Sequence, residues 1–182
     1  MDMSLRREKM LIAAATALLL SLGLLCPGRD KAQDGGTSGA FRYSGDHQTA
    51  QVQKQVKAVV ERYQDGLNTG DFSKIRPLFA ADAVAEWNDK ATVVGIDAMA
   101  KPYADLFKAI KFDTDFQYDA VDILGDTAIV RTHHPVGQTE LFIKDGSKKL
   151  DFNREIFVLR RIDTQWKIIL YTFNTQPRQG EQ

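Results

Sequence analysis

Apolar residues recur with two different periods along the chain, and the change of period separates a helical part from a strand part. From residue 49 to residue 70 the apolar side chains are three or four positions apart, at Val52, Val56, Val59, Tyr63 and Leu67. This spacing puts them on one face of a helix, which the Asn-Thr-Gly-Asp sequence at 68–71 is suited to end.

Two more helices are predicted after the first. Asp71 is suited to cap a short second helix, with apolar residues at Phe72, Ile75, Leu78 and Phe79. Asp97 is suited to cap a third helix, whose apolar face comprises Met99, Tyr103, Leu106, Phe107 and Ile110. Between these two helices, a turn at 88–90 joins two short predicted strands, Ala83–Trp87 and Thr92–Val94.

The rest of the chain has the alternation and the β-branched composition of strands. Turn sequences at 125–126 and 145–147 separate these strands, which are predicted at 115–124, 127–134, 138–144, 150–161 and 165–175. Helices and strands segregated in this way predict an α+β fold. We expect a curved antiparallel sheet wrapped over three N-terminal helices, a cone of the cystatin-like α+β roll type, with a cavity between them.

The N-terminal 47 residues lack this globular pattern. Basic residues precede an uncharged apolar run of 15 residues, Leu11–Leu25, which is shorter than the roughly 20 residues of a membrane-spanning helix. We expect a signal peptide at 1–28, a flexible spacer at 29–47, the cone domain at 48–176 and a frayed tail at 177–182. The protein would then be exported, to the periplasm or the medium; an uncleaved anchor is the alternative.

The composition limits the classes of binding partner that we expect. The chain is 43% apolar and 26% charged, with a formal net charge of zero, so it has no basic field, and nucleic acid is not expected as a partner. Cys26, the single cysteine, directly follows the apolar run. Lipidation there is an alternative to simple cleavage, and the membrane is expected as a partner only through such lipidation or the signal peptide.

Three stretches resemble the nuclear transport factor 2-like superfamily, in particular its SnoaL-like and ketosteroid isomerase-like branch. They are YQDGLNTGDF at 63–72 with LFAADAV at 78–84, VGIDA at 94–98, and NREIFVLRRIDTQWKI at 153–168 with YTFN at 171–174. The resemblance covers about residues 50–175. It implies a cone pocket and a homodimer formed through the outer sheet face, but this fold serves isomerases, cyclases, dehydratases and binding modules alike.

The isomerases of this branch hold a dienolate with a tyrosine and a protonated aspartate, while a second aspartate moves the proton. The resemblance places Tyr63 on the tyrosine, but it places Trp87 on the proton-moving aspartate and Val158 on or beside the protonated one. Isomerase activity of that type is therefore not expected. Asp89 is two residues from the position of the proton-moving aspartate, so a shifted loop could restore that carboxylate.

The catalytic candidates are Tyr63 and Arg154, which would polarise an oxygen, and Asp89 or His133, which would move a proton. Consecutive residues of a strand face opposite ways, so only one of Arg154 and Glu155 enters the cavity, and the resemblance favours Arg154. The alternatives are a core tyrosine at Tyr63 and an ion pair at Arg154 on the outer face of the sheet.

Three aromatic residues, Trp87, Tyr103 and Tyr171, are expected to bind the ligand. His133 and His134 are adjacent on a strand and cannot easily share one ion, so neither a metal nor a cofactor is expected. Either histidine could still line the pocket as a base.

The sequence thus predicts an exported SnoaL-like protein that binds a small apolar or aromatic molecule in the cone pocket, with or without isomerase- or cyclase-type acid–base chemistry. The alternative is a non-catalytic dimeric interaction module. A pocket plugged by Trp87 and Tyr171 would favour the module.

Overall fold

The computed structural model describes residues 41–175. The predicted signal peptide, most of the spacer, and the tail lie outside the described residues. The elements are α1 (His47–Thr69), α2 (Phe72–Ile75), η1 (Arg76–Leu78), β1 (Phe79–Glu86), β2 (Val93–Val94), α3 (Ile96–Ala109), β3 (Ile110–Lys111), β4 (Gln117–Leu124), β5 (Thr127–His133), β6 (Thr139–Phe142), β7 (Lys148–Leu150), β8 (Asn153–Ile162) and β9 (Gln165–Thr175). Within this range, no helix combines the length and the apolar character needed to cross a membrane.

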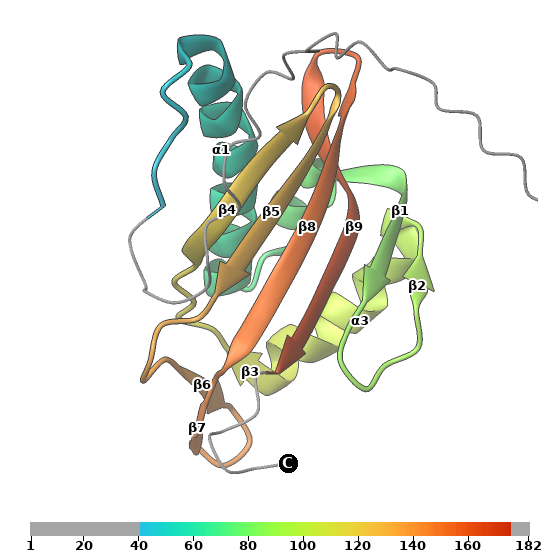
Figure 1. The fold of residues 1–182 in the computed structure, drawn as a ribbon. Coiled ribbons are helices and arrows are strands. Elements are labelled where there is room, and N and C mark those ends of the chain that lie inside the picture. The colour runs from blue at the N-terminus through green and yellow to red at the C-terminus, as the bar shows by residue number, and fades with distance from the viewer. Residues whose placement is uncertain (1–40, 176–182) are drawn as a thin grey trace, which may run out of the picture. The chain divides into compact units, whose positions relative to one another are not determined.

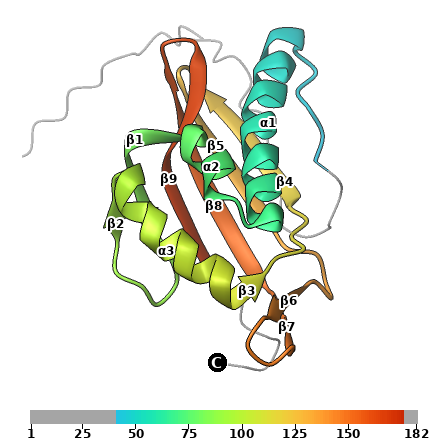
Figure 2. The ribbon, with the colours of Figure 1, turned by 180° about the vertical axis from the view of Figure 1, so that it is seen from behind.

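Six strands form the main sheet, in the order β2-β1-β9-β8-β5-β4. The helices α1, α2 and α3 cover one face of this sheet, and the opposite face is free of described helices (Figures 1 and 2). The predicted α+β fold with three N-terminal helices is confirmed. The sheet is mixed rather than fully antiparallel, because β1 runs parallel to β9.

Helix α1 begins and ends where its sequence provides caps. The Asp46 side chain accepts a hydrogen bond from Thr49 N (2.8 Å), and Gly70 adopts the left-handed conformation (φ 62°) that ends the helix. Part of the expected spacer belongs to the domain, because Ser44 N donates to the side chain of Gln53 (2.8 Å).

Of the predicted caps of the other two helices, one is confirmed and one is not. Asp71 caps α2 as predicted, accepting from Ser73 N (2.9 Å). The prediction that Asp97 caps α3 is wrong, because Gly95 holds the N-cap position. Asp97 lies in the first turn and pairs with Arg76 (2.6 Å).

The strand predicted at 150–161 is interrupted. Its first residue belongs to β7, which forms a small second sheet with β6 and β3, whereas β8 belongs to the main sheet. The break falls at Asp151, whose buried side chain accepts a hydrogen bond from Asn153 N (3.1 Å) and lies 2.7 Å from His134 Nδ1. The β6–β7 hairpin is therefore an arm beyond the end of β8 (Figure 1).

Aromatic rings fill the core between α1 and the sheet. Tyr63 on α1 has ring centroids of Phe79, Phe116, Phe157 and Tyr171 within 6.4 Å. Tyr63 and Tyr171 are also on the boundary of a cavity, so the core and the candidate site share residues.

Candidate functional site

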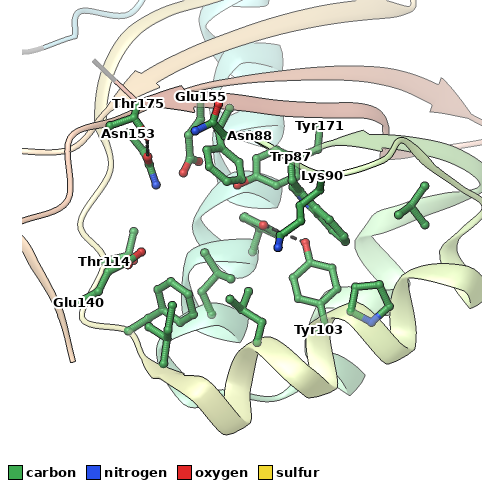
Figure 3. Close-up of a pocket in the computed structure, with 18 of the residues that line it drawn as sticks. Trp87, Asn88, Lys90, Tyr103, Thr114, Glu140, Asn153, Glu155, Tyr171 and Thr175 are labelled. Atoms are coloured by element: carbon green, nitrogen blue, oxygen red, sulfur yellow. Dashed lines mark hydrogen bonds between the residues drawn. The ribbon is translucent and has the colours of Figure 1, made fainter. Parts of the chain in front are cut away.

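A cavity of about 710 Å³ lies between α3, the C-terminal half of α1 and the concave face of the sheet. Pockets that bind small molecules usually measure about 300–1,000 Å³. In Figure 3, Tyr103 comes from α3, Glu155 and Tyr171 come from the sheet, and Lys90 extends from the loop after β1. The aromatic residues of the lining are Tyr63, Trp87, Tyr103, Phe112, Tyr171 and Phe173.

Four residues predicted from the sequence meet in this cavity: Tyr63, Trp87, Tyr103 and Tyr171. The hydroxyl groups of Tyr63 and Tyr103 are 2.8 Å apart. Burial raises the pKa of both phenols above the ordinary tyrosine value. Both hydroxyl groups are therefore protonated near neutral pH and act as hydrogen-bond donors or acceptors rather than as bases.

The expectation that Arg154 enters the cavity is wrong. Its guanidinium group is exposed and donates two hydrogen bonds to Asn174 Oδ1, from Nε (3.0 Å) and Nη2 (2.7 Å). Glu155, only 3% exposed, lines the cavity instead. The charged residue of β8 that lines the cavity is therefore Glu155, whereas the resemblance favoured Arg154.

Two further candidates also lie outside the cavity. His133 is on the outer face of the sheet, with its Nδ1 2.9 Å from Asp119 Oδ1, whereas His134 is buried and lines the cavity. Asp89 is exposed in the turn after β1, where it has a φ of 58°. Its neighbours Asn88 and Lys90 line the mouth of the cavity.

His134 and Glu155 in the cavity lining belong to a buried acid–base cluster that the sequence reasoning missed. His134 Nδ1 lies 2.7 Å from Asp151 Oδ2, and His134 Nε2 lies 3.2 Å from Glu155 Oε1. The side chain of Gln138 supports the cluster by donating to Asp151 Oδ2 (3.3 Å). The contact between His134 Nε2 and Glu155 Oε1 is an ion pair without hydrogen-bond geometry. Among the described residues, therefore, neither His134 Nε2 nor Glu155 Oε2 has a hydrogen-bond partner.

The cluster shifts the pKa of each member. Burial alone would lower the pKa of His134, but Asp151 and Glu155 together raise it to about 9. Burial raises the pKa of Glu155, and the neighbouring His134 offsets this only in part. Burial also acts to raise the pKa of Asp151, but His134 outweighs it and the pKa is lowered. Near neutral pH the cluster thus contains an Asp151–His134 ion pair and a Glu155 that binds its proton more tightly than usual.

Glu140 adds a fourth titratable group from β6. It is half-buried in the cavity lining, and burial together with the charge of Asp151 raises its pKa to about 7. No group of three or more His, Cys, Asp or Glu residues within 41–175 has an arrangement that could hold a metal ion. The titratable side chains of the described site are able to transfer protons and to form hydrogen bonds.

A sequence signal for the correct histidine did exist. His133 has the same strand parity as Arg131, an exposed charge, whereas His134 has the parity of Thr132 and Val130, which are buried. A charged residue two positions away marks the solvent face of a strand. This parity would have assigned His134 to the cavity.

The fold agrees with the comparisons to known proteins. The model of the SnoaL-like domain matches residues 60–168, more than half of the chain. The chain belongs to the SnoaL-like domain family. No protein with a curated description matches it in sequence.

Solved structures similar to this SnoaL-like protein share its fold. A ketosteroid isomerase-like protein from Erwinia carotovora atroseptica is 23% identical, with a TM-score of 0.64 over 69% of this chain and 97% of that one. A nuclear transport factor 2-like superfamily protein from Salmonella enterica serovar Typhimurium is 19% identical, with a TM-score of 0.60 over 72% and 96%. A proposed scytalone dehydratase from Novosphingobium aromaticivorans is 16% identical, with a TM-score of 0.60 over 69% and 85%. At these identities the likeness establishes the fold alone.

Proposed function

We propose that this SnoaL-like domain binds a small, largely apolar or aromatic molecule in its cavity and exchanges a proton with it. The observation that carries the proposal is Glu155, a carboxyl group that is buried against the cavity and has an oxygen without a hydrogen-bond partner among residues 41–175. Leaving a buried polar group unpaired costs about 1–3 kcal/mol. A ligand that bonds to Glu155 recovers this free energy, which favours binding at that point of the cavity.

Each polar residue of the cavity has a separate role in this proposal. Glu155 accepts a proton from the ligand or returns one to it, and His134 stabilises the charge that forms on Glu155. Asp151 acts as a positioning residue, because its 2.7 Å contact with His134 Nδ1 holds the ring with Nε2 3.2 Å from Glu155 Oε1. The paired hydroxyl groups of Tyr63 and Tyr103 hydrogen-bond a polar atom of the ligand. These assignments replace Arg154, Asp89 and His133.

The size of the cavity also bears on the choice between a ligand-binding protein and a non-catalytic interaction module. A pocket plugged by Trp87 and Tyr171 would favour the module. Both side chains instead border an open volume of about 710 Å³. The volume supports the ligand-binding function.

The proposal also places the protein outside the cytoplasm, on the strength of the apolar run at Leu11–Leu25. Expression of the full chain, followed by cell fractionation and mass measurement of the mature protein, tests this. Export with signal-peptide cleavage gives a mature species that starts after residue 28. A full-length protein retained in the cytoplasm contradicts export and leaves the pocket chemistry untouched.

The pocket function can be tested without a known ligand. Protein purified gently from its native source is denatured, and the released small molecules are identified by mass spectrometry. We expect one compound in near-stoichiometric amount in the wild type and in the outer-face control Arg154→Gln, and a reduced amount in Glu155→Gln.

Proton exchange is then measured by incubating the released compound with protein in D₂O and following deuterium uptake by NMR. We expect uptake with the wild type and with Arg154→Gln, and uptake at least a hundredfold slower with Glu155→Gln, since a positioned acid–base group contributes roughly 10²–10⁴-fold. Binding without any exchange would reduce the proposal to a carrier function. The absence of any bound compound would reject it.

A further inference from the structure

Carboxyl groups outnumber cations at one end of the cavity. Glu155 from β8 and Glu140 from β6 line it, Asp151 contacts the lining residue His134 from the break between β7 and β8, and His134 is the one cation among these four. His134 pairs with Asp151 and also lies 3.2 Å from Glu155, so this cluster has one cation for three carboxyl groups within residues 41–175. This end of the cavity is built to receive positive charge or hydrogen-bond donors.

Among residues 41–175, the only cation that an anionic ligand would meet there is His134, which already pairs with Asp151 and lies beside Glu155. Arg154, which the sequence placed in the cavity, lies on the opposite face of the sheet. Lys90 is exposed at the mouth, where water screens its charge. Asp105, also at the rim, forms an ion pair with Lys101, and Lys101 is not part of the lining. A carboxylate or phosphate on the ligand would lose its hydration without gaining a buried partner.

The walls of the cavity are suited to a cation as well. Tyr63, Trp87, Tyr103 and Tyr171 line it together with two phenylalanines. The face of an aromatic ring attracts a cation, and ammonium groups are commonly bound among several such rings. Glu155 points from the sheet toward the cavity (Figure 3), with an unpaired oxygen in a side chain only 3% exposed.

We infer that the ligand carries a protonated amine on an aromatic or apolar body, with the amine bound to Glu155 and the body against the aromatic walls. The inference rests on the function proposed above, because it names the ligand class of the same cavity. An ammonium group supplies the donor that Glu155 Oε2 lacks, and its charge offsets the excess of carboxyl groups.

The inference predicts a characteristic pH dependence. The charged groups of the lining near the amine are Glu155, Glu140 and His134, with Asp151 behind His134 and with Lys90 and Asp105 at the mouth; the tyrosines stay neutral. An amine binds best when the two glutamates are ionised, and the pKa of Glu140 is about 7. Raising the pH from 5.5 to 8 should therefore strengthen amine binding about tenfold, and binding at pH 6 should release protons.

The experiment uses three series of probes with indole, naphthalene or biphenyl as the body. Each series carries an ammonium, a hydroxyl or a carboxylate group on the same two-carbon arm, as in tryptamine, tryptophol and indole-3-propionate. Affinities are measured by isothermal titration calorimetry in buffers of different ionisation enthalpy, which counts the protons released. We expect the amine of at least one series to bind ten or more times tighter than its alcohol, and the carboxylate to bind most weakly.

Variants separate this inference from a general affinity for aromatic molecules. Glu155→Gln, or Glu140→Gln at a half-buried position if the first variant does not fold, should weaken amine binding at least tenfold and change alcohol binding less than threefold. Arg154→Gln, on the outer face of the same strand, should change neither. Circular dichroism and cooperative unfolding establish that each variant is folded.

The outcomes distinguish a failure of the amine inference from a failure of the pocket function. If an alcohol or a carboxylate binds the wild type as tightly as the matching amine, or if both glutamine variants keep amine affinity within threefold, the amine inference is overturned and the pocket function stands. If no probe of any series binds the folded wild type, the pocket function fails and the inference fails with it.

Discussion

The two faces of the sheet at β5 and β8 carry similar charged residues in opposite surroundings. On the outer face, Arg154 and His133 are register partners, and each makes polar contacts at the solvent-exposed surface. On the inner face, Glu155 and His134 are buried beside each other, with an ion pair that also includes Asp151. Among these residues, only His134 and Glu155 line the cavity. The side of the sheet, more than the type of residue, decides which charged group can be functional.

The largest difference between the two faces is expected in the loss of stability when a packed side chain is truncated. Phe157, on the inner face, is fully buried against Tyr63, Phe116 and Tyr171, whereas its neighbour Ile156 is 38% exposed. Phe157→Ala should lower the free energy of unfolding by about 3–5 kcal/mol, and Ile156→Ala by roughly 0.5–1 kcal/mol. Urea unfolding followed by circular dichroism measures both, and equal losses would contradict the assignment of the two faces.

The adjacent histidines give the second contrast. His134→Ala leaves Asp151 and Glu155 buried without their cation, and removing one partner of a buried ion pair costs about 3–5 kcal/mol. His133→Ala removes an exposed contact to Asp119, which is worth about 1 kcal/mol or less. The same unfolding experiment at pH 7 compares them. A His134 variant as stable as the His133 variant would mean that the inner cluster is not charged as described.

The inner cluster also predicts how stability changes with pH. The pKa of His134 is about 9 in the folded protein, against an ordinary value of 6.5. Its contribution to stability is therefore fully present below about pH 6.5 and is lost as the pH rises to about 9. Glu140 has a pKa of about 7 against an ordinary value of 4.5, so its contribution to stability also falls as the pH rises from about 4.5 to about 7.

We therefore expect the free energy of unfolding to fall by on the order of 3 kcal/mol between pH 6.5 and 9. Urea titrations at four pH values across this window measure the slope. The slope should be largely lost in His134→Gln and kept in His133→Gln, which is the matched control. A wild-type stability that rises over the same window would show that His134 is not held in its charged form.

The sequence predicted the helices, the hairpin turns and the four aromatic residues of the cavity because these depend on local patterns. Periodicity and caps place α1, and the turn at 125–126 sets the pairing of β4 with β5. The acid–base cluster depends on longer-range structure. Asp151 contacts His134 at the point where β7 and β8 separate, and Glu140 reaches the cavity from the β6–β7 hairpin, which lies outside the main sheet.

The pair Arg154 and Glu155 illustrates the remaining difficulty. Both alternating sets of residues on β8 contain large apolar side chains: Ile156 and Val158 on one face, Phe157 and Leu159 on the other. Hydrophobic alternation therefore cannot identify the inner face of this strand. The register with β5 and β9 does so, because it aligns Phe157 with Val130 and Tyr171, all of which are buried.

The apolar residues on the outer face have their own explanation if the protein forms the homodimer that the family resemblance implies. Ile129, Val158 and Leu170 are register neighbours across β5, β8 and β9, with Ile156 beside them, and no described helix covers this face (Figure 1). Ile156→Lys should change the stability of the isolated domain by only about 0.5 kcal/mol. It should nevertheless convert the dimer to a monomer, because a two-fold axis near this patch brings two added charges together.

Light scattering coupled to size-exclusion chromatography measures this last and smallest effect on folding, with Ile156→Val as the control that should remain dimeric. A dimer that survives Ile156→Lys would place the interface elsewhere, and a wild type that is monomeric at every concentration would leave the apolar outer face unexplained. Because the lysine variant keeps Phe157, Glu155 and His134 in place, it should also retain ligand binding. The comparison of the two faces would then separate assembly, on the outer face, from chemistry on the inner one.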